Sequence, residues 1–314
     1  MAKIVVVTGG AGFIGSHLCD LLIGKGFKVV CIDNLITGSK KNISHLQKNE
    51  NFEFLQKDVV KDSLGIKKAD YIFHLASPAS PIDYQMYSEE TALTNSLGTI
   101  KMLELAKKTS AKFLLASTSE VYGDPKEHPQ KETYWGNVNS FGPRSCYDEA
   151  KRFAETMTYL YIHKYGVDGR VIRIFNTYGP KMRKDDGRAV SNFINQAISG
   201  KPLTVNGDGN QTRSFCYVSD MVAGIEKALM TKGTKGEIFN LGNPEEYKII
   251  DLAEKIGKMA GLKSKIVFGP YPQDDPRQRK PDITKAKKLL DWEPKISVDE
   301  GLRETIKYYK NLKE

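Results

Sequence analysis

A tyrosine and a lysine four positions apart on one helix can form a proton-transfer pair, and Tyr147 and Lys151 have this spacing. They open residues 147–164, where the spacing of apolar residues predicts a helix, so both side chains lie on one helix face. A free phenol has a pKa near ~10, and a neighbouring ammonium group stabilises its phenolate form. We therefore predict that Tyr147 is a catalytic base and that Lys151 assists it.

A second Tyr-x-x-x-Lys match runs from Tyr122 to Lys126. Gly123 and Pro125 lie inside it and predict a turn, which does not bring the two side chains to one helix face. The spacing alone is a frequent accident, so the assignment of Tyr147 depends on the segments that precede it.

Hydroxyl and carboxyl side chains end the segment FLLASTSEVYG, which predicts a buried strand. Thr118, Ser119 and Glu120 then lie at the carboxyl edge of the sheet, where open α/β sheets bind ligands. We expect Thr118 to contact a substrate hydroxyl beside Tyr147. The alternatives are that the hydroxyls cap the following turn and that Glu120 is a surface residue without a role.

A glycine-rich turn, TGGAGFIG, directly follows the first predicted strand and precedes a predicted helix. Gly9, Gly12 and Gly15 allow the backbone to approach a pyrophosphate at the helix N-terminus. Asp33 ends the second predicted strand, where a carboxylate accepts hydrogen bonds from ribose hydroxyls and repels a 2′-phosphate. A strand-end Asp can also simply cap a turn, but after this glycine turn we predict an NAD site. The positive nicotinamide ring then also favours the phenolate of Tyr147.

Alternating strand and helix patterns position these residues. Short apolar runs predict buried strands at KIVVVTG, KVVCID, FEFLQKDV, YIFHLAS, KFLLASTS and GRVIRIFN. Helical spacing covers residues 14–25, 90–107 and 147–164. This alternation predicts an α/β fold with a doubly wound, parallel Rossmann sheet.

The pattern changes after Asn176, where a Gly/Pro/Arg-rich stretch leads into a predicted helix at residues 190–199. We therefore predict an NAD-binding domain at residues 1–175 and a smaller C-terminal substrate-binding domain at residues 176–314. The apolar run of residues 237–243, EIFNLGN, predicts a strand that returns to the main sheet, so the two domains interleave.

Composition narrows the function classes. No segment has the ~20 apolar residues of a membrane helix, and the N-terminus lacks a signal-peptide pattern, so we expect a cytoplasmic protein. The four cysteines are scattered and no metal-ligand spacing occurs, so we expect reduced thiols and no metal. The formal charge of +9 is spread along the chain without a basic run, which favours small anionic ligands over nucleic acid.

Six blocks of mixed chemistry extend along the chain: HLASPASP, STSEVYGDP, GPRSCYDEAKRFAE, RIFNTYGPKM, DGRAVSNFI and DDPRQRKPD. With these blocks the chain resembles the extended short-chain dehydrogenases/reductases of the NAD-dependent epimerase/dehydratase family. It resembles the UDP-glucuronate decarboxylases (UDP-xylose synthases) most closely, essentially from end to end. Ser140 and Asp83 depart from the pattern, and Asp83 bears on a substrate loop.

The resemblance implies a carboxy-lyase that converts UDP-glucuronate to UDP-xylose through a 4-keto intermediate. Tyr147 takes the proton of the sugar 4-hydroxyl while hydride passes to NAD. The new ketone lies β to the carboxyl group, so carbon dioxide leaves readily; protonation and return of hydride regenerate NAD. By similarity, Glu120 and Ser119 orient the sugar acid and a water.

The resemblance also implies contacts for the nucleotide sugar and the cofactor. Asn176, Arg213, Arg277 and Arg279 are the expected substrate contacts, since guanidinium groups suit phosphate and carboxylate oxygens. Lys181 is expected near the cofactor or uridine pocket. Besides Tyr147 and Lys151, the expected cofactor contacts are Gly9, Gly12, Phe13, Ile14, Gly15, Asp33, Asn34, Thr37, Gly38, Asp58, Val59, Leu75, Ala76, Ser77, Thr177 and Arg188.

Other functions remain open on the sequence alone. Within the same class, the alternatives are a uronate 4-epimerase and a 4,6-dehydratase. A dehydratase needs an acid at the position of Ser119 to protonate a leaving hydroxyl, so Ser119 argues against that alternative. A different class is a non-catalytic NAD-sensing or RNA-associated Rossmann protein, which commonly lacks the tyrosine–lysine pair. The resemblance also implies a homodimer in which the helices at residues 90–107 and 147–164 pair across the interface.

Overall fold

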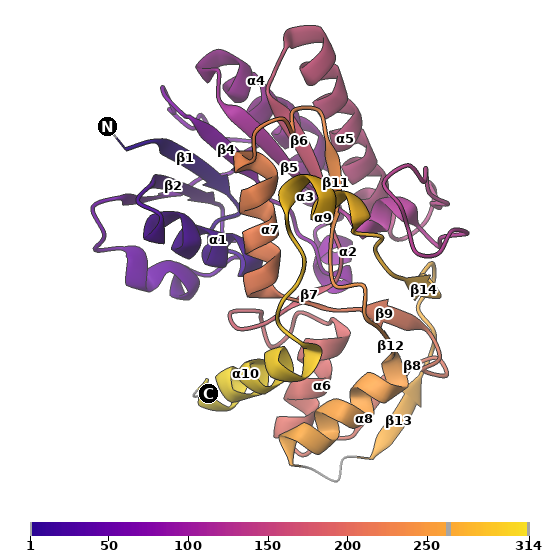
Figure 1. Ribbon diagram of the computed structural model, residues 1–314. Coiled ribbons are helices and arrows are strands. Elements are labelled where there is room, and N and C mark those ends of the chain that lie inside the picture. Colours follow the sequence, from indigo (N-terminus) through magenta and orange to yellow (C-terminus); the bar gives the residue numbers. More distant parts are fainter. Residues whose placement is uncertain (1, 262–264, 313–314) are drawn as a thin grey trace.

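A seven-stranded parallel sheet forms the centre of the protein (Figure 1), in a computed structural model that describes residues 2–261 and 265–312. The strand order is β11-β6-β5-β4-β1-β2-β3, and every neighbouring pair runs parallel. The strands are β1 (Ile4–Thr8), β2 (Lys28–Asp33), β3 (Phe52–Gln56), β4 (Tyr71–His74), β5 (Lys112–Thr118), β6 (Gly169–Ile174) and β11 (Ile238–Leu241). The predicted α/β fold with a doubly wound Rossmann sheet is confirmed.

The order of the strands reverses between β1 and β4, which places a crevice at the carboxyl edge of the sheet. Thr8, Asp33 and Thr118 each end a strand at this edge. The chain reaches this arrangement because β1, β4 and β5 are apolar over nearly their whole length, as strands covered on both faces must be.

Helices cover both faces of the sheet. One face packs against α1 (Phe13–Gly24), α7 (Val218–Met230) and α9 (Thr284–Leu290), and the other against α4 (Thr99–Thr109) and α5 (Ser145–Tyr165). In Figure 1, α7 crosses in front of the sheet beside α1. The predicted helix at residues 90–107 is divided into α3 (Ser88–Leu93), a π-helical turn at Thr94–Gly98, and α4. Helix α7 was not predicted.

A second hydrophobic core lies below the sheet in the view of Figure 1. It joins α6 (Ala189–Ile198), α8 (Ile249–Ala260) and α10 (Val298–Asn311). Short strands flank these helices: β8 (Leu203–Asn206) pairs with β13 (Ile266–Gly269), and β9 (Thr212–Ser214) lies between β12 (Glu246–Lys248) and β14 (Gln278–Arg279). The remaining short elements are α2 (Pro81–Met86), β7 (Thr177–Tyr178), β10 (Cys216–Tyr217) and the 3-10 helices at Lys40–Leu46 and Ser119–Tyr122.

The segment 237–243 contributes β11, which pairs with β6 at the edge of the main sheet. The later part of the chain therefore supplies both α7 and β11 to the sheet and also the second core. The division into domains at residue 176 stays a prediction.

In the described part of the chain, no helix is long and apolar enough to cross a membrane. The four cysteines are free, and Cys19, Cys31 and Cys216 are buried. Over the same residues, no group of three or more His, Cys, Asp or Glu side chains is placed to hold a metal ion. The cytoplasmic location stays a prediction.

Candidate active site

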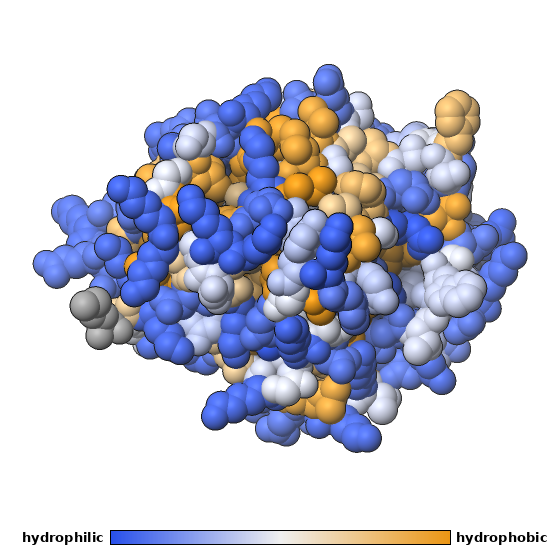
Figure 2. All heavy atoms as spheres, turned by 90° about the horizontal axis from the view of Figure 1, so that it is seen from above, coloured by the Kyte–Doolittle hydropathy of each residue, from blue (hydrophilic) through white to orange (hydrophobic). Residues whose placement is uncertain are grey.

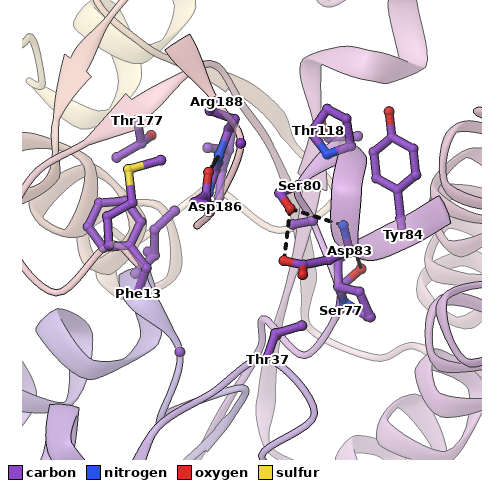
Figure 3. Close-up of a pocket in the computed structure, with 18 of the residues that line it drawn as sticks. Phe13, Thr37, Ser77, Ser80, Asp83, Tyr84, Thr118, Thr177, Asp186 and Arg188 are labelled. Atoms are coloured by element: carbon purple, nitrogen blue, oxygen red, sulfur yellow. Dashed lines mark hydrogen bonds and ion pairs between the residues drawn. The ribbon is translucent and has the colours of Figure 1, made fainter. Parts of the chain in front are cut away.

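A cavity of about 560 Å³ opens at the carboxyl edge of the sheet, between the sheet and the second core. The glycine turn, the ends of β2, β5 and β6, and the loops around residues 75–84 and 181–190 line it. In Figure 3, Phe13, Asp186 and Arg188 lie on one side of the cavity, and Ser80, Asp83 and Tyr84 lie on the other. The cavity thus lies between segments that are remote in sequence.

The glycine turn is packed too closely against neighbouring backbone to accept side chains. A Cβ atom on Gly15 would lie 2.1 Å from the Gly9 carbonyl oxygen, and one on Gly9 would lie 2.8 Å from the Ala76 backbone nitrogen. Gly9 also has a φ of +71°, which side chains disfavour. Helix α1 begins after Gly12 without a side-chain cap and without an acidic residue in its first turn. Its free N–H groups and the helix dipole fit a pyrophosphate.

Asp33 lies in the part of the cavity where we predict that the adenosine of the cofactor binds. Its carboxylate accepts hydrogen bonds from the backbone N–H groups of Ala11 (3.0 Å) and Leu35 (2.8 Å) and lines the cavity. Burial is the largest cause of its raised pKa, which the backbone hydrogen bonds oppose. A Cβ on Gly38 would lie 2.7 Å from an Asp33 oxygen, so this position needs glycine. The residues around Asp33 therefore fit the ribose of NAD.

We predict that Asp33→Asn shifts cofactor preference toward NADP. The substitution keeps the size of the side chain but removes the charge that repels a 2′-phosphate, so the ratio of NADP to NAD affinity rises by about tenfold or more. Titration of the purified protein with each cofactor measures this ratio. Asp251→Asn, at an exposed carboxylate in the first turn of α8, is the control; a ratio that does not change in Asp33→Asn contradicts the assignment.

Tyr147, Thr118 and Lys151 converge on the cavity wall. The three residues are 5%, 7% and 3% exposed and all line the cavity. Burial raises the pKa of Tyr147, and the Thr118 hydroxyl beside the phenol lowers it by a smaller amount. Lys151 Nζ donates to the Ala116 carbonyl oxygen (2.8 Å) and lies 5.8 Å from the centre of the Tyr147 ring. Burial lowers the pKa of Lys151 to about 7.

Glu155 holds this part of α5 against the sheet. It accepts hydrogen bonds from Ser117 on β5 (2.6 Å) and from two nitrogens of Arg173 on β6 (2.7 and 3.0 Å). Glu155 lies one turn after Lys151, and its negative charge opposes the fall in the Lys151 pKa. The alternative pair is excluded by position, since Tyr122 is buried and donates its hydroxyl to Asn240 (2.7 Å).

Tyr84 is a cavity residue that the sequence did not single out. Its ring stacks on that of Tyr147, with centres 4.9 Å apart and planes within 6° of parallel. The residue is 1% exposed, and its hydroxyl oxygen has no hydrogen-bond partner within the described residues. Ser80 starts α2 by accepting a hydrogen bond from the Asp83 N–H and so orients Tyr84. Nothing in the spacing distinguishes Tyr84 among the 15 tyrosines of the chain.

Arginines and carboxylates alternate at another part of the cavity wall. Glu120 binds Arg144 (2.5 Å) and forms a two-nitrogen contact with Arg279, one of whose bonds is 3.0 Å long. Asp275 binds Arg144 (3.2 Å) and Arg213 (2.7 Å). Burial would raise the pKa of Glu120, but the two guanidinium groups hold it well below its usual range. Glu120 is therefore an anion, not an acid, at neutral pH. The sequence did not single out Arg144 or Asp275.

The structure brings most of the predicted site residues together. The predicted residues that line the cavity are Gly9, Gly12, Phe13, Ile14, Gly15, Asp33, Asn34, Thr37, Val59, Leu75, Ala76, Ser77, Thr118, Ser119, Glu120, Tyr147, Lys151, Asn176, Thr177, Arg188, Arg213 and Arg279. Lys181 lines it as well and pairs with Asp20 (2.6 Å).

Three predicted contacts lie outside the lining. Gly38 lies behind Asp33. The Asp58 carboxylate accepts hydrogen bonds from the Asn34 amide (2.9 Å) and the Val60 N–H (2.7 Å). The side chain of Arg277 is exposed, and its backbone N–H donates to Asp124 (3.0 Å). Asp58 therefore contacts the cavity residue Asn34, whereas the exposed Arg277 side chain lies outside the lining.

Asp83, which departs from the family pattern, connects the two sides of the cavity. Its carboxylate pairs with Arg183 (2.7 Å) on the opposite loop and accepts a hydrogen bond from Ser80 (2.8 Å). Tyr309 on α10 holds that opposite loop through the Met182 carbonyl oxygen (2.8 Å). The expectation that Asp83 bears on a loop of the site agrees with this position.

Comparison with known proteins assigns the chain to a family. The sequence profile of GDP-mannose 4,6 dehydratase matches residues 6–305. UDP-glucuronic acid decarboxylase 1 of Arabidopsis thaliana is 56% identical over 307 residues, which cover 98% of this chain and 70% of the relative. The chain belongs to the UDP-glucuronic acid decarboxylase family. Another family member, UDP-glucuronic acid decarboxylase 1 of Xenopus tropicalis, is 54% identical over 98% of this chain and 72% of its own length. The predicted family is confirmed.

Solved structures of neighbouring families share the architecture of this decarboxylase family member. UDP-glucuronic acid 4-epimerase from Bacillus cereus, in complex with UDP-glucuronic acid and NAD, is 32% identical, with a TM-score of 0.91 over 99% of this chain and 100% of that one. A dTDP-glucose 4,6-dehydratase from Bacillus anthracis in complex with NAD is 28% identical, with a TM-score of 0.86 over 99% and 97%. The fold is thus common to several reactions, and the side chains of the site must distinguish them.

Proposed function

We propose that this protein is an NAD-dependent carboxy-lyase that converts UDP-glucuronate to UDP-xylose through a 4-keto intermediate. The observation that carries the proposal is the convergence of Tyr147, Lys151 and Thr118 in one cavity with the arginines that hold Glu120. The relatives named UDP-glucuronic acid decarboxylase, 56% and 54% identical along the chain, support the same reaction.

NAD is the cofactor that the site fits. The open N-terminus of α1, the glycines without room for a Cβ and the Asp33 carboxylate provide for its pyrophosphate and ribose. The prediction of NAD agrees with the two solved neighbours, which contain it. When bound, NAD supplies the hydride chemistry at carbon 4 of the sugar.

Tyr147 takes the proton of the sugar 4-hydroxyl, and the Thr118 hydroxyl, which lines the cavity beside the phenol, hydrogen-bonds and orients the same sugar hydroxyl. Burial opposes ionisation of Tyr147, so the phenolate requires positive charge close to it. Lys151 provides this charge, and with a pKa of about 7 it is near half protonation at neutral pH. The Ala116 carbonyl oxygen and Glu155 favour the ammonium form.

Loss of carbon dioxide follows once a ketone lies β to the carboxyl group. Arg144, Arg213 and Arg279 are buried guanidinium groups on the cavity wall and suit the carboxylate and diphosphate of the substrate. Glu120 stays ionised and fixes two of them in place. Ser119 is buried beside it and lines the cavity, so it is available to position a water or the sugar acid.

The alternative functions can be distinguished by their products or by the residues that they require. A uronate 4-epimerase would return an isomer of unchanged mass, and a 4,6-dehydratase needs an acid that Ser119 does not supply. A non-catalytic NAD-sensing or RNA-associated protein has no need of the assembled Tyr147, Lys151 and Thr118.

Incubation with UDP-glucuronate and mass spectrometry of the products tests the proposal. We expect carbon dioxide and UDP-xylose. An isomer of unchanged mass would assign the protein to the epimerases, and inertness toward every uronate would overturn the proposal. Retention of RNA that weakens with salt, without turnover of any nucleotide sugar, would support the RNA-associated alternative.

We further propose that the protein is a homodimer through α3, the π-helical turn and α5. Apolar side chains on these elements are exposed: Leu93 (38%), Leu97 (41%), Phe153 (42%) and Leu160 (43%). Figure 2 shows apolar side chains gathered within a mainly hydrophilic surface. Helices α3 and α5 contact each other, so their exposed side chains form one surface that a second copy would cover.

We predict that Leu160→Glu converts the dimer to a monomer, because a charge in an apolar interface loses its water without gaining a partner. Light scattering coupled to size-exclusion chromatography should show half the wild-type mass. Leu289→Glu, at an equally exposed leucine on α9, should leave the mass unchanged. A wild-type protein that is monomeric, or a Leu160→Glu variant that stays dimeric, contradicts this interface.

A further inference from the structure

A chain of alternating charges crosses the cavity wall in the order Arg213, Asp275, Arg144, Glu120, Arg279. Each carboxylate is shared between two guanidinium groups. Arg213 on β9 and Arg279 on β14 are register partners in adjacent strands, so two positive side chains originate side by side. Like charges in this position repel unless anions separate them.

The two carboxylates of this charge chain are held differently. Glu120 follows the end of β5 in a 3-10 helix, is 15% exposed and is bound by two guanidinium groups. Asp275 lies on the irregular segment between β13 and β14, and its side chain is 25% exposed. The framework of the sheet therefore fixes Glu120, whereas Asp275 is attached to the site by a loop.

Arg213 depends on Asp275 for its charge balance. Asp275 is the only carboxylate that forms an ion pair with Arg213 in the described part of the chain. Burial lowers the pKa of Arg213, the positive charge of Arg279 lowers it further, and Asp275 opposes both effects. A buried cation of this kind requires an anion beside it.

We propose that Asp275 is a positioning residue that occupies the Arg213–Arg144 pair as a stand-in anion and is exchanged for the diphosphate of the nucleotide sugar when substrate binds. This inference rests on the function proposed above. A diphosphate carries more charge and more acceptor oxygens than one carboxylate, so it displaces Asp275 from Arg213.

The exchange has a consequence for Glu120. Arg144 joins Asp275 to Glu120, with Nη1 directed to the former and Nη2 to the latter. Release of Asp275 frees Nη1 for the substrate while Nη2 stays on Glu120. Binding of the nucleotide at Arg213 is thereby transmitted to the carboxylate that we place beside the reacting sugar.

Asp275→Asn tests the exchange because it keeps the shape of the side chain and removes the competing charge. We expect the NAD-loaded variant to bind UDP about five- to tenfold more tightly than the wild type. Uridine, which has no phosphate, should bind equally to both proteins. Asp275→Glu retains the charge and should restore an affinity for UDP within about twofold of the wild type.

Asp274→Asn is the matched control. Asp274 precedes Asp275 on the same loop, carries the same charge, is exposed and accepts a hydrogen bond from Asn139 (3.0 Å). Its φ of +58° is one that asparagine tolerates well. Its removal should leave UDP affinity unchanged, so a gain in Asp275→Asn alone would exclude a general effect of the lower negative charge.

Isothermal titration with UDP and steady-state kinetics with UDP-glucuronate together decide the proposal. We expect both KM and kcat of Asp275→Asn to fall, because nucleotide is held more tightly while Arg144 loses a tether. UDP affinity that is unchanged or weaker would overturn the stand-in role. A wild-type protein that fails to bind UDP would overturn this inference and the proposed substrate together, whereas UDP binding without decarboxylation would overturn only the proposed reaction.

Discussion

Replacement of Tyr147 by phenylalanine should lower kcat for UDP-glucuronate by about 10³-fold, the usual scale for loss of a catalytic proton-transfer group. The variant removes one oxygen atom, the one that the Thr118 hydroxyl contacts. It keeps the aromatic ring and therefore the 4.9 Å stack on Tyr84. The cavity should keep its shape, and NAD affinity should stay within about twofold of the wild type.

Measurement of turnover and of cofactor binding on the same preparation separates chemistry from folding. Tyr159→Phe is the matched control, since Tyr159 lies on the same helix with 62% of its surface exposed. It should retain full activity. A Tyr147→Phe variant with more than about a tenth of wild-type kcat would remove this residue from the role of base, and loss of NAD binding would show instead that the phenol supports the cavity.

The main features of the fold follow from local sequence. Strands β1, β2 and β5 are apolar runs next to glycine or helical segments, and their pattern requires burial on both faces. Helix α7 was missed because it follows the turn-rich residues 205–215, which suggested a longer irregular stretch. The break in the helix at Thr94–Gly98 was also missed, since a single π-helical turn inside a helix has no distinct signal in one sequence.

Some residues of the site can be predicted from local sequence, whereas others depend on contacts between distant segments. The glycine turn, Asp33 and the Tyr147–Lys151 pair depend on spacing within a few residues or on the end of a strand. Tyr84, Arg144 and Asp275 acquire their roles from neighbours brought together by the fold: Asp275 is 131 residues from Arg144, its partner. Ion pairs over such separations leave no pattern in a single sequence.

Asp83 shows how a departure from a family pattern becomes interpretable in three dimensions. From the sequence, it was a residue of unexpected type on a loop. In the structure, it pairs with Arg183 across the cavity, and a Cβ on the nearby Gly187 would lie 2.3 Å from Ile82, which precedes Asp83 on α2. Helix α2 and the loop that carries Arg183 and Gly187 therefore meet through one ionic and one close apolar contact.

Replacement of Glu120 by alanine should impair loss of carbon dioxide more than the initial oxidation of the sugar. Glu120 is the anion between Arg144 and Arg279, which are only 5% and 2% exposed. Without it, both guanidinium groups lose their shared partner and turn toward the substrate carboxylate. They would then stabilise the ground-state carboxylate, whose bonding electrons must pass into the ketone as neutral carbon dioxide leaves, so decarboxylation should slow by about 10²-fold or more.

Oxidation should be less affected, because Lys151 makes no ion pair with Glu120 in the described part of the chain, and Glu120 contacts Thr118 through its backbone N–H (3.2 Å), which the substitution retains. Single-turnover experiments with UDP-glucuronate can follow reduced cofactor and released carbon dioxide on the same sample. Glu120→Ala should accumulate reduced cofactor and the 4-keto sugar before carbon dioxide appears. Glu120→Gln keeps the volume of the side chain and should show the same order of effects, which separates the role of the charge from that of packing.

An equal loss in both steps would argue that Glu120 only supports the fold. That alternative is physically reasonable, since removal of one partner from a buried ion pair commonly costs about 3–5 kcal/mol of stability. Thermal unfolding of the variants distinguishes the two cases. A stable variant that stops after oxidation would show that the charge of Glu120, through the arginines it holds, governs the release of carbon dioxide.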